Sequence, residues 1–280
     1  MKIIKSENEI IKLCSDLNIP TSFVPTMGAL HGGHIELLKE GKKHSKFLIA
    51  SLFVNPLQFN NHKDLLSYPR NLDQDIETFK KYGVDILYIP NEKDILNSNL
   101  KKIDSGRAGR IMEGKFRPGH FDGVLTIVNK FFEIINPNFA FFGIKDFQQL
   151  CLIYSNLSPL HNVNIIPVET VRDNNGLALS SRNKLLDFNQ KKNASNLYKG
   201  LSLARKKFIE NKSLNIEKYL YDFYSKYNSF EIEYVLNEKI SIFNQENVHI
   251  PDLFDGQDCT VIMVAAKISN VRLIDNILVN

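Results

Sequence analysis

The chain has little cysteine and no long apolar run. Both absences restrict the cellular compartment in which we expect to find the protein. Its three cysteines, Cys14, Cys151 and Cys259, are far apart, odd in number and form no Cys-x-x-Cys pair. This pattern argues against a disulfide framework or a cysteine zinc site and favours a reducing compartment. No apolar stretch approaches the roughly 18 residues that a membrane-spanning helix needs. The first residues alternate charged and apolar side chains, unlike a secretory signal, so we expect a cytoplasmic protein with no membrane partner.

An excess of one charge is also missing. The net charge is only +4, and the hydrophobic share of 43% and the charged share of 24% are ordinary for a globular protein. Nucleic-acid binding would require a clustered basic face. The nearest cluster, Lys191, Lys192 and Lys199 with residues 205–207, is better explained as a solvated helix face. We therefore expect small-molecule substrates, which can be anionic, and no nucleic acid.

The first part of the chain alternates strand and helix patterns. Because such alternation implies parallel pairing with helices on both faces of the sheet, we predict an α/β domain with a parallel sheet over residues 1–171. Ligands of such sheets bind beyond the carboxyl ends of the strands. The expected strands are residues 22–26, 47–54, 84–89, 139–142 and 163–168, and the expected helices are 33–43, 71–82, 124–135 and 146–156.

The pattern changes after the polar stretch 173–176, which we interpret as a hinge. Residues 172–280 predict a smaller α+β C-terminal domain. Charged helical patterns cover 189–211 and 216–227, and strand patterns cover 231–236, 260–266 and 271–274.

The most informative segment is Met-Gly-Ala-Leu-His-Gly-Gly-His at residues 27–34. It follows a strand pattern and precedes a helical one, so the first N–H groups of that helix should lack partners and attract phosphate. His31 and His34 are three residues apart and can reach one anion from the same helical face. A lone His-x-Gly-His arises by chance, but its place between strand and helix favours a site.

Two further segments follow strand patterns or precede helical ones. Asn55 and Gln58 would present uncharged donors and acceptors in a dry pocket, although a capped turn explains Asn55 equally well. Arg117 and His120 flank a Pro-Gly turn, for which a surface loop is the simpler explanation until other evidence is added.

The last two segments offer groups for phosphate. Lys145 and Asp146 follow the strand pattern that ends at Gly143, and Gln149 can face the same crevice. Residues 180–182, Ser-Ser-Arg, supply two hydroxyls and a guanidinium that keeps its charge, which suits an anion clamp. An ordinary capped helix start is the alternative for each.

Taken in chain order, these segments resemble the pantoate–β-alanine ligase (AMP-forming, pantothenate synthetase) family. The matching motifs run from about residue 23 to 276 and cover nearly the whole chain. They are Pro-Thr-Met-Gly-Ala-Leu-His-Gly-Gly-His (25–34), Phe-Val-Asn-Pro-Leu-Gln-Phe (53–59), Tyr-Pro-Arg (68–70), Arg-Pro-Gly-His-Phe (117–121), Lys-Asp-Phe-Gln-Gln-Leu (145–150), Gly-Leu-Ala-Leu-Ser-Ser-Arg-Asn (176–183), Val-Ala-Ala (264–266) and Arg-Leu-Ile-Asp-Asn (272–276).

The resemblance implies a Rossmann-like nucleotidyltransferase domain with a smaller, lid-like second domain. It also implies a two-step reaction in pantothenate biosynthesis. Pantoate carboxylate attacks the α-phosphate of ATP, and the amine of β-alanine then displaces AMP from pantoyl adenylate. Mg²⁺ would arrive with the triphosphate, with no dedicated metal site in the protein. The family is typically a homodimer, so we expect one here.

The resemblance also implies residue roles. His34 takes the place usually assigned to a proton donor, and His31, Lys145 and Arg182 complete the expected catalytic set. Pantoate and β-alanine are assigned to Gln58, Gln149, Asn55 and Arg117. The residues expected to bind ATP are Met27, Gly28, Ala29, Leu30, His31, Gly32, Gly33, His34, Gly143, Ile144, Lys145, Asp146, Val171, Leu179, Ser180, Ser181 and Arg182.

Two positions depart from the family pattern. Gly32 stands where an acidic residue is usual, and Ile144 stands where the family has glutamate. Neither change touches the histidines, the glutamines or the Ser-Ser-Arg set, so we still expect activity.

Three alternatives differ in testable ways. Another nucleotidyltransferase with the same histidine signature, such as a cytidylyltransferase, would lack the two glutamine segments. An aminoacyl-tRNA synthetase is disfavoured because no anticodon-binding extension is evident. A nucleotide-binding regulator without catalysis would bind ATP and form no AMP.

Overall fold

The computed structural model describes residues 1–97, 100–245 and 248–279, and its chain forms two compact units. The N-terminal unit comprises Met1–Gly143 and Gln148–Val168, and the C-terminal unit comprises Ile144–Phe147 and Glu169–Asn280. Ile144–Phe147 thus belongs to the C-terminal unit although it lies well before its main segment. The functional boundary drawn from the sequence between residues 171 and 172 stays a prediction.

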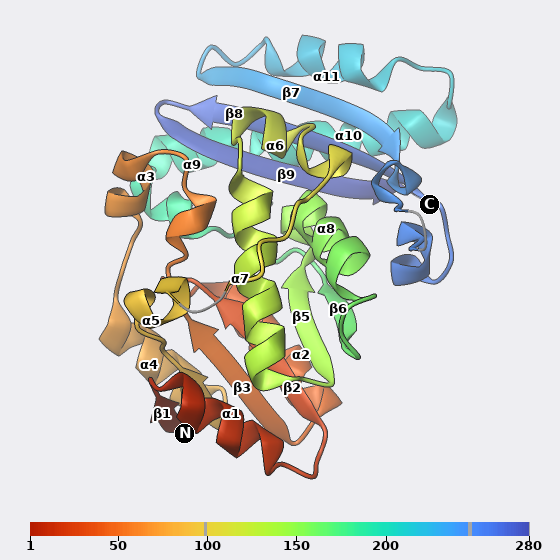
Figure 1. Cartoon of the computed structure of the whole chain (residues 1–280). Helices are drawn as coiled ribbons and strands as arrows, with labels where there is room; N and C mark the ends of the chain where they lie inside the picture. The colour runs from red at the N-terminus through yellow and green to blue at the C-terminus, as the bar shows by residue number, and fades with distance from the viewer. Residues whose placement is uncertain (98–99, 246–247, 280) are drawn as a thin grey trace. The chain divides into compact units, whose positions relative to one another are not determined.

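The described residues of the N-terminal unit form a six-stranded sheet whose strands all run parallel (Figure 1). The order is β1-β4-β3-β2-β5-β6, so the direction of progression reverses beside β2. Ligands of open parallel sheets bind at such a reversal, beyond the strands' carboxyl ends. The strands are β1 (Lys2–Ile4), β2 (Thr21–Thr26), β3 (Phe47–Leu52), β4 (Ile86–Tyr88), β5 (Phe139–Gly143) and β6 (Asn164–Val168).

Helices cover both faces of this sheet, as the alternation predicted. Neighbouring residues of β2 point to opposite faces: the ring of Phe23 meets Phe131 of α7, whereas Val24 belongs to a core with Leu38 of α2. In Figure 1, α7 lies in front of the strands and α2 behind them. The helices and 3₁₀ turns of this unit are α1 (Glu7–Ser15), α2 (Gly32–His44), η1 (Pro56–Gln58), α3 (His62–Ser67), α4 (Leu72–Lys81), α5 (Glu92–Asn97), η2 (Arg107–Gly109), α6 (Glu113–Phe116), α7 (His120–Ile135) and α8 (Phe147–Leu157), whose first residue belongs to the C-terminal unit.

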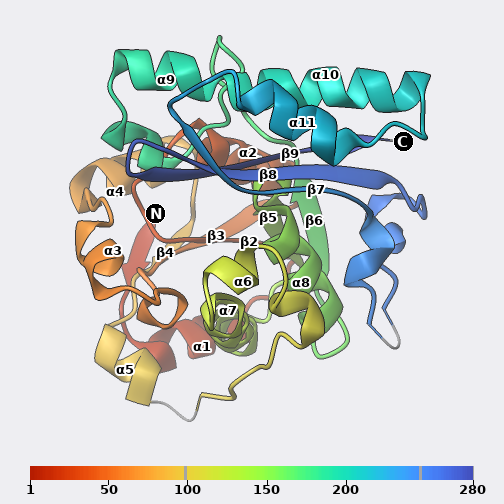
Figure 2. The same cartoon turned by 90° about the horizontal axis from the view of Figure 1, so that it is seen from above.

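In its described residues, the C-terminal unit has a three-stranded antiparallel sheet of order β7-β8-β9. Figure 2 shows α10 and α11 along one face of this sheet. The strands are β7 (Phe230–Lys239), β8 (Thr260–Ile268) and β9 (Val271–Val279); the helices are α9 (Phe188–Ala194), α10 (Asn196–Glu210) and α11 (Ile216–Tyr224); and the 3₁₀ turns are η3 (Ile144–Asp146), η4 (Ser181–Leu185), η5 (Ile240–Phe243) and η6 (Ile250–Phe254).

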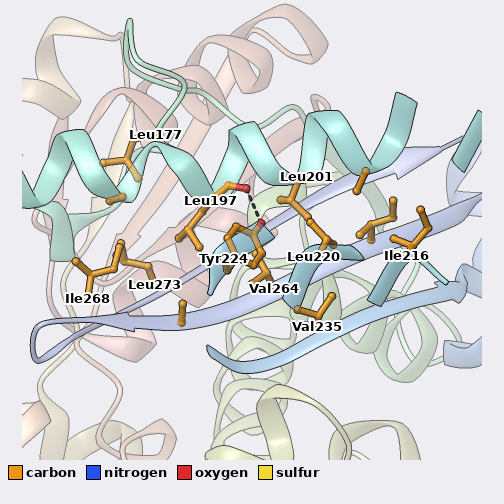
Figure 3. Close-up of a cluster of buried hydrophobic side chains, with 14 of the residues drawn as sticks. Leu177, Leu197, Leu201, Ile216, Leu220, Tyr224, Val235, Val264, Ile268 and Leu273 are labelled. Atoms are coloured by element: carbon orange, nitrogen blue, oxygen red, sulfur yellow. Dashed lines mark hydrogen bonds between the residues drawn. The ribbon is translucent and has the colours of Figure 1, made fainter. Parts of the chain in front are cut away.

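The core of this unit lies between the sheet and its helices (Figure 3). Leu197 and Leu201 of α10 and Leu220 of α11 pack on Val264 of β8 and Leu273 of β9. The hydroxyl of Tyr224 donates a hydrogen bond to the carbonyl of Leu197 at 2.7 Å inside this core. Burial raises the pKa of Tyr224 well above its ordinary value, so the ring stays neutral and its O–H remains a donor.

The structure corrects three of the expected elements. The single helix predicted over 189–211 is divided at Ser195, whose hydroxyl donates to the carbonyl of Lys192 and competes with the helical ladder. The last strand continues from the expected 271–274 to Val279, because its pairing with β8 continues through the buried polar residues Asp275 and Asn276. The stretch 173–176 is a hydrogen-bonded turn within the C-terminal unit, not a linker: Asp173 accepts from Asn175 and Leu177.

Candidate active site

A buried carboxylate fixes the turn that follows β2. Gly28 and Ala29 both have left-handed backbone, with φ of 79° and 51°. Asp75 of α4 is 3% exposed, and its two carboxylate oxygens accept the N–H groups of Ala29 and Leu30, each at 2.8 Å. A Cβ on Gly28 would lie 2.8 Å from Oδ2 of Asp75, so this position requires glycine for its backbone and for its space. The hydrogen bonds to Asp75 offset the roughly 1–3 kcal/mol that a left-handed alanine costs.

The two histidines cap the amino end of α2 reciprocally. Nδ1 of His31 accepts the N–H of Gly33 at 3.1 Å, and Nδ1 of His34 accepts the N–H of His31 at 3.3 Å. Their ring centroids are 4.1 Å apart, so the prediction that the two rings share a face is confirmed. A neutral imidazole whose Nδ1 accepts a hydrogen bond carries its proton on Nε2. The cap therefore makes Nε2 the donor nitrogen of both rings.

The expectation that the first N–H groups of this helix lack partners is wrong for Gly33, whose N–H donates to Nδ1 of His31. In the turn before the helix, the N–H groups of Ala29 and Leu30 donate to Asp75. Gly33 permits this because a Cβ there would lie 2.9 Å from Cε1 of His31 and push the ring away. An anion at this end of α2 would meet the imidazole donors and the positive end of the helix dipole.

Three of the predicted substrate residues form one hydrogen-bonded cluster at the carboxyl end of β3. The side chain of Asn55 accepts from the N–H of Leu57, and its Nδ2 donates to Oε1 of Gln58 at 3.1 Å. Buried His120 contacts the carbonyl of Gln58 through Nδ1 at 2.8 Å and Nη1 of Arg117 through Nε2 at 2.9 Å. Because a guanidinium only donates, Nε2 must accept and Nδ1–H must donate to Gln58. His120 thus joins Gln58 to Arg117.

The fourth predicted substrate residue, Gln149, lies half-buried in the first part of α8. Its neighbour Gln148 is buried and holds the segment before α6: its Nε2 donates to the carbonyls of Ala108 and Ile111, and its Oε1 accepts from Glu113. Gln149 therefore projects from a well-anchored helix, and its role stays a prediction.

The remaining predicted ATP residues lie in the C-terminal unit, apart from Gly143 at the end of β5. Lys145 is half-buried in η3, with Nζ 3.2 Å from Oδ1 of Asp146. Ser180 caps η4 by accepting the N–H of Arg182 at 3.3 Å. The N–H of Leu179 donates to the carbonyl of Val171 at 2.9 Å, so these two positions are directly paired.

One strand contacts both of these turns. β9 packs against η3, which carries Lys145, and against η4, which carries Ser181 and Arg182. Ile144 is buried in this unit, which explains how an apolar side chain is accommodated where the resembling family has glutamate. β9 therefore contacts both the lysine segment and the Ser-Ser-Arg turn within the C-terminal unit.

Sequence reasoning missed Asp75 and gave His120 no role. A signal for Asp75 was present, since it lies three residues after Leu72 and four before Phe79 and so falls on the apolar face of its helix. His120 had no such signal, because its partner Gln58 is 62 positions away in the chain.

We expect Asp75→Asn to weaken this turn. The amide oxygen of asparagine can accept one of the two N–H groups, but its NH₂ would face the other donor, so the free energy of unfolding should fall by about 1–3 kcal/mol. The rate of AMP release should fall as well, because the turn sets His31 and His34. Asp73→Asn, at an exposed position in the same helix, is the matched control. The free energy of unfolding is measured by urea denaturation. If this free energy and the rate of AMP release are the same in the two variants, Asp75 does not have this role.

Within residues 1–97, 100–245 and 248–279, no three His, Cys, Asp or Glu side chains gather as metal ligands would. Over the same part of the chain, none of the helices combines the length and apolar character required to cross a bilayer.

A parallel sheet that reverses its order beside β2, with donor-bearing turns after its central strands, defines a nucleotidyltransferase-like, nucleotide-binding protein. Comparison with known proteins gives the family. The family model described as pantoate-beta-alanine ligase matches residues 2–278, and the chain belongs to this family of ligases.

The sequence is similar to those of individual family members over nearly its full length. The chain is 40% identical to the pantothenate synthetase of Azobacteroides pseudotrichonymphae, with 99% of each chain covered. It is 38% identical to the pantoate–beta-alanine ligase of Schizosaccharomyces pombe, covering 91% of this chain and 90% of that one.

The fold is also similar to solved structures of this family. The pantothenate synthetase of Thermus thermophilus matches with a TM-score of 0.85 at 30% identity, over 99% of both chains. The pantoate-beta-alanine ligase of Francisella tularensis, in complex with beta-gamma ATP and beta-alanine, matches with a TM-score of 0.79 at 35% identity, over 99% of this chain and 97% of that one.

Proposed function

We propose that this chain joins pantoate to β-alanine at the expense of ATP and so makes pantothenate. The observation that carries the proposal is the reciprocal histidine cap at the carboxyl end of β2, which makes Nε2 the donor in two adjacent rings. Membership of the ligase family supports the same conclusion. The relative from Francisella tularensis is titled as a complex with beta-gamma ATP and beta-alanine, which supports these two substrates here.

In the first step, a carboxylate oxygen of pantoate attacks the α-phosphorus of ATP. A bond forms between the carboxylate oxygen and the α-phosphorus, the bond from that phosphorus to the oxygen bridging the β-phosphate breaks, and pyrophosphate leaves. Mg²⁺ that arrives with ATP would neutralise part of the phosphate charge. In the second step, the amine of β-alanine attacks the acyl carbon of pantoyl adenylate, AMP leaves, and the amine loses a proton. Both steps require positioning and neutralisation of phosphate charge more than covalent help from the protein.

The chain offers groups for each of these tasks. His31 and His34 would donate from Nε2 to phosphate oxygens, with His34 stabilising the charge that develops as pyrophosphate leaves. Lys145 and residues 180–182 would hold the triphosphate. Pantoate would be bound by Gln58, Asn55 and Arg117. The direct hydrogen bond between Asn55 and Gln58, and the link from Gln58 through His120 to Arg117, would pre-organise these three residues. Neutral amides suit this place because they do not compete with the carboxylate as nucleophiles.

We also propose that the enzyme works in the cytoplasm and as a homodimer. Cys14 and Cys259 are free thiols, and burial raises the pKa of Cys14 to about 11, so this thiol stays protonated and unreactive at neutral pH. This supports the cytoplasmic location expected from the sequence. The homodimer implied by the family is testable by sedimentation equilibrium, where a monomer at micromolar concentration would count against it.

The test is pantoate-dependent exchange of pyrophosphate into ATP in the absence of β-alanine. We expect exchange, because the acyl adenylate forms before the amine is needed. Release of AMP should then require β-alanine as well. Folded protein that binds ATP but shows no exchange would contradict the two-step reaction and would favour a nucleotide-binding regulator.

A further inference from the structure

We propose that Asn276 is a positioning residue for Lys145, and that β9 is the frame that sets this lysine relative to the Ser-Ser-Arg turn. The inference deepens the proposed function, since it assigns part of the ATP site to a strand near the end of the described chain. All of the residues involved belong to the C-terminal unit.

The side chain of Asn276 holds η3 through two consecutive carbonyl groups. It is 3% exposed, and its Nδ2 donates to the carbonyls of Ile144 and Lys145, each at 2.9 Å. A carboxamide NH₂ has two hydrogens, so both are used. The α-carbon of Lys145 lies between the two peptide groups that are held. Asn276 therefore fixes the backbone on both sides of Lys145 and with it the direction in which the ammonium group leaves the chain.

The neighbouring residue fastens the other side of the strand. Because side chains alternate along a strand, Asp275 shares a face with Leu273 and points away from Asn276. Its carboxylate binds the guanidinium of Arg172 through two hydrogen bonds of 2.6 and 2.8 Å. Arg172 directly follows Val171, which pairs with Leu179 just before the Ser-Ser-Arg turn. β9 thus anchors the lysine segment through Asn276 and the start of the Ser-Ser-Arg loop through the preceding residue, Asp275.

The chemistry of position 276 accounts for the residue found there. A buried amide is costly unless its groups are bonded, and this one has both hydrogens satisfied and its backbone N–H donated to Asp275. Aspartate at this position would lose both donors and place negative charge against two carbonyl oxygens. An apolar residue would suit a buried strand but would leave the two carbonyls without these donors. Asparagine supplies the two N–H donors that the carbonyls of Ile144 and Lys145 accept.

The test compares Asn276→Ala with Tyr224→Phe. The control also removes a buried hydrogen bond to a backbone carbonyl, in the same unit but in the core shown in Figure 3. The measurements are the dissociation constant of ATP by calorimetry, the kinetic constants of pantoate-dependent pyrophosphate exchange, and amide hydrogen exchange of the peptide that covers residues 143–147. Asn276→Ser, which keeps one hydroxyl donor, serves if the alanine variant does not fold.

For Asn276→Ala we expect weaker ATP binding, faster amide exchange over 143–147, and a kcat lower by a factor on the order of 10², since misplacing a charged group by about 1 Å can cost that much. The KM for pantoate should not change, because its predicted ligands belong to the N-terminal unit. Asn276→Ser should lie between alanine and wild type, and Tyr224→Phe should keep wild-type ATP binding and kcat.

ATP binding and kcat in Asn276→Ala that equal those of Tyr224→Phe would overturn the proposal. If the wild type itself shows no pyrophosphate exchange, the proposed function fails. ATP affinity and amide exchange then still decide whether Asn276 sets Lys145.

Discussion

Replacing His34 by alanine should lower the rate of pantoate-dependent AMP formation by a factor on the order of 10²–10³, the usual cost of losing one donor to developing charge. His34 is suited to this role because its Nδ1 is engaged by the N–H of His31, which leaves Nε2 as the donor nitrogen. Steady-state kinetics should place most of the loss in kcat, since the interaction strengthens as pyrophosphate leaves.

Two further variants separate catalysis from capping. His34→Gln keeps an acceptor at the third position of α2, where glutamine can restore the reciprocal cap, so it should recover stability without the imidazole's contribution to rate. His44→Ala changes an exposed histidine at the other end of the same helix and should leave the rate unchanged. A His34→Ala enzyme within a few-fold of wild type would show that His34 is not a catalytic donor.

Replacing Arg172 by methionine should lower the free energy of unfolding by about 3–5 kcal/mol at neutral pH, the usual cost of breaking one side of a buried ion pair. The Asp275 side chain is only 2% exposed and would be left without its cation. The Tyr198 ring, 3.5 Å from the guanidinium carbon, would lose a stacked cation. Urea denaturation measures the loss.

The destabilisation should shrink as the pH falls. Burial raises the pKa of Asp275 above its ordinary value, although Arg172 opposes this, so removing Arg172 should raise the pKa further. An acid with a raised folded pKa holds a proton that the unfolded chain has already lost. The variant therefore gains stability as the pH falls through that pKa and loses it as the pH rises. The difference from wild type should be smaller at pH 5 than at pH 8.

A double variant and a surface control complete this test. Replacing both Arg172 and Asp275 by apolar residues, as Met and Leu, should recover much of the loss, because no charge then remains buried. Arg110→Met removes the exposed partner of Asp104 and should have no measurable effect. An Arg172→Met protein as stable as wild type at pH 8 would show that the buried pair does not hold the C-terminal unit together.

Several features of the site follow from local sequence alone. The strand, glycine turn and helix around residues 27–34 were predicted with boundaries within a residue or two of β2 and α2. The spacing of His31 and His34 fixed their shared face, because residues three apart are neighbours on a helix. The alternation of strands and helices also predicted the parallel sheet, since parallel strands require crossover connections.

Other features were settled only by contacts between distant parts of the chain. Asp75 meets Ala29 across 46 positions, and Asn276 meets Lys145 across 131. In the sequence these residues are single polar letters within a helix and a strand, where their cost of burial suggests exposure. Helical periodicity places Asp75 on the apolar face of α4, but periodicity does not identify the distant backbone groups with which Asp75 and Asn276 form hydrogen bonds.

The sequence by itself determined the α/β class, the ligase family it resembles and which side chains face one another within a single turn, because these depend on spacing along the chain. Tertiary structure alone decided that His120 donates from Nδ1 to the carbonyl of Gln58, that Ile144–Phe147 joins the C-terminal unit, and that β9 carries both Asp275 and Asn276 as anchors. The physical reason is that hydrogen bonds and buried charges are satisfied in space, between residues whose distance in the chain carries no information about their contact.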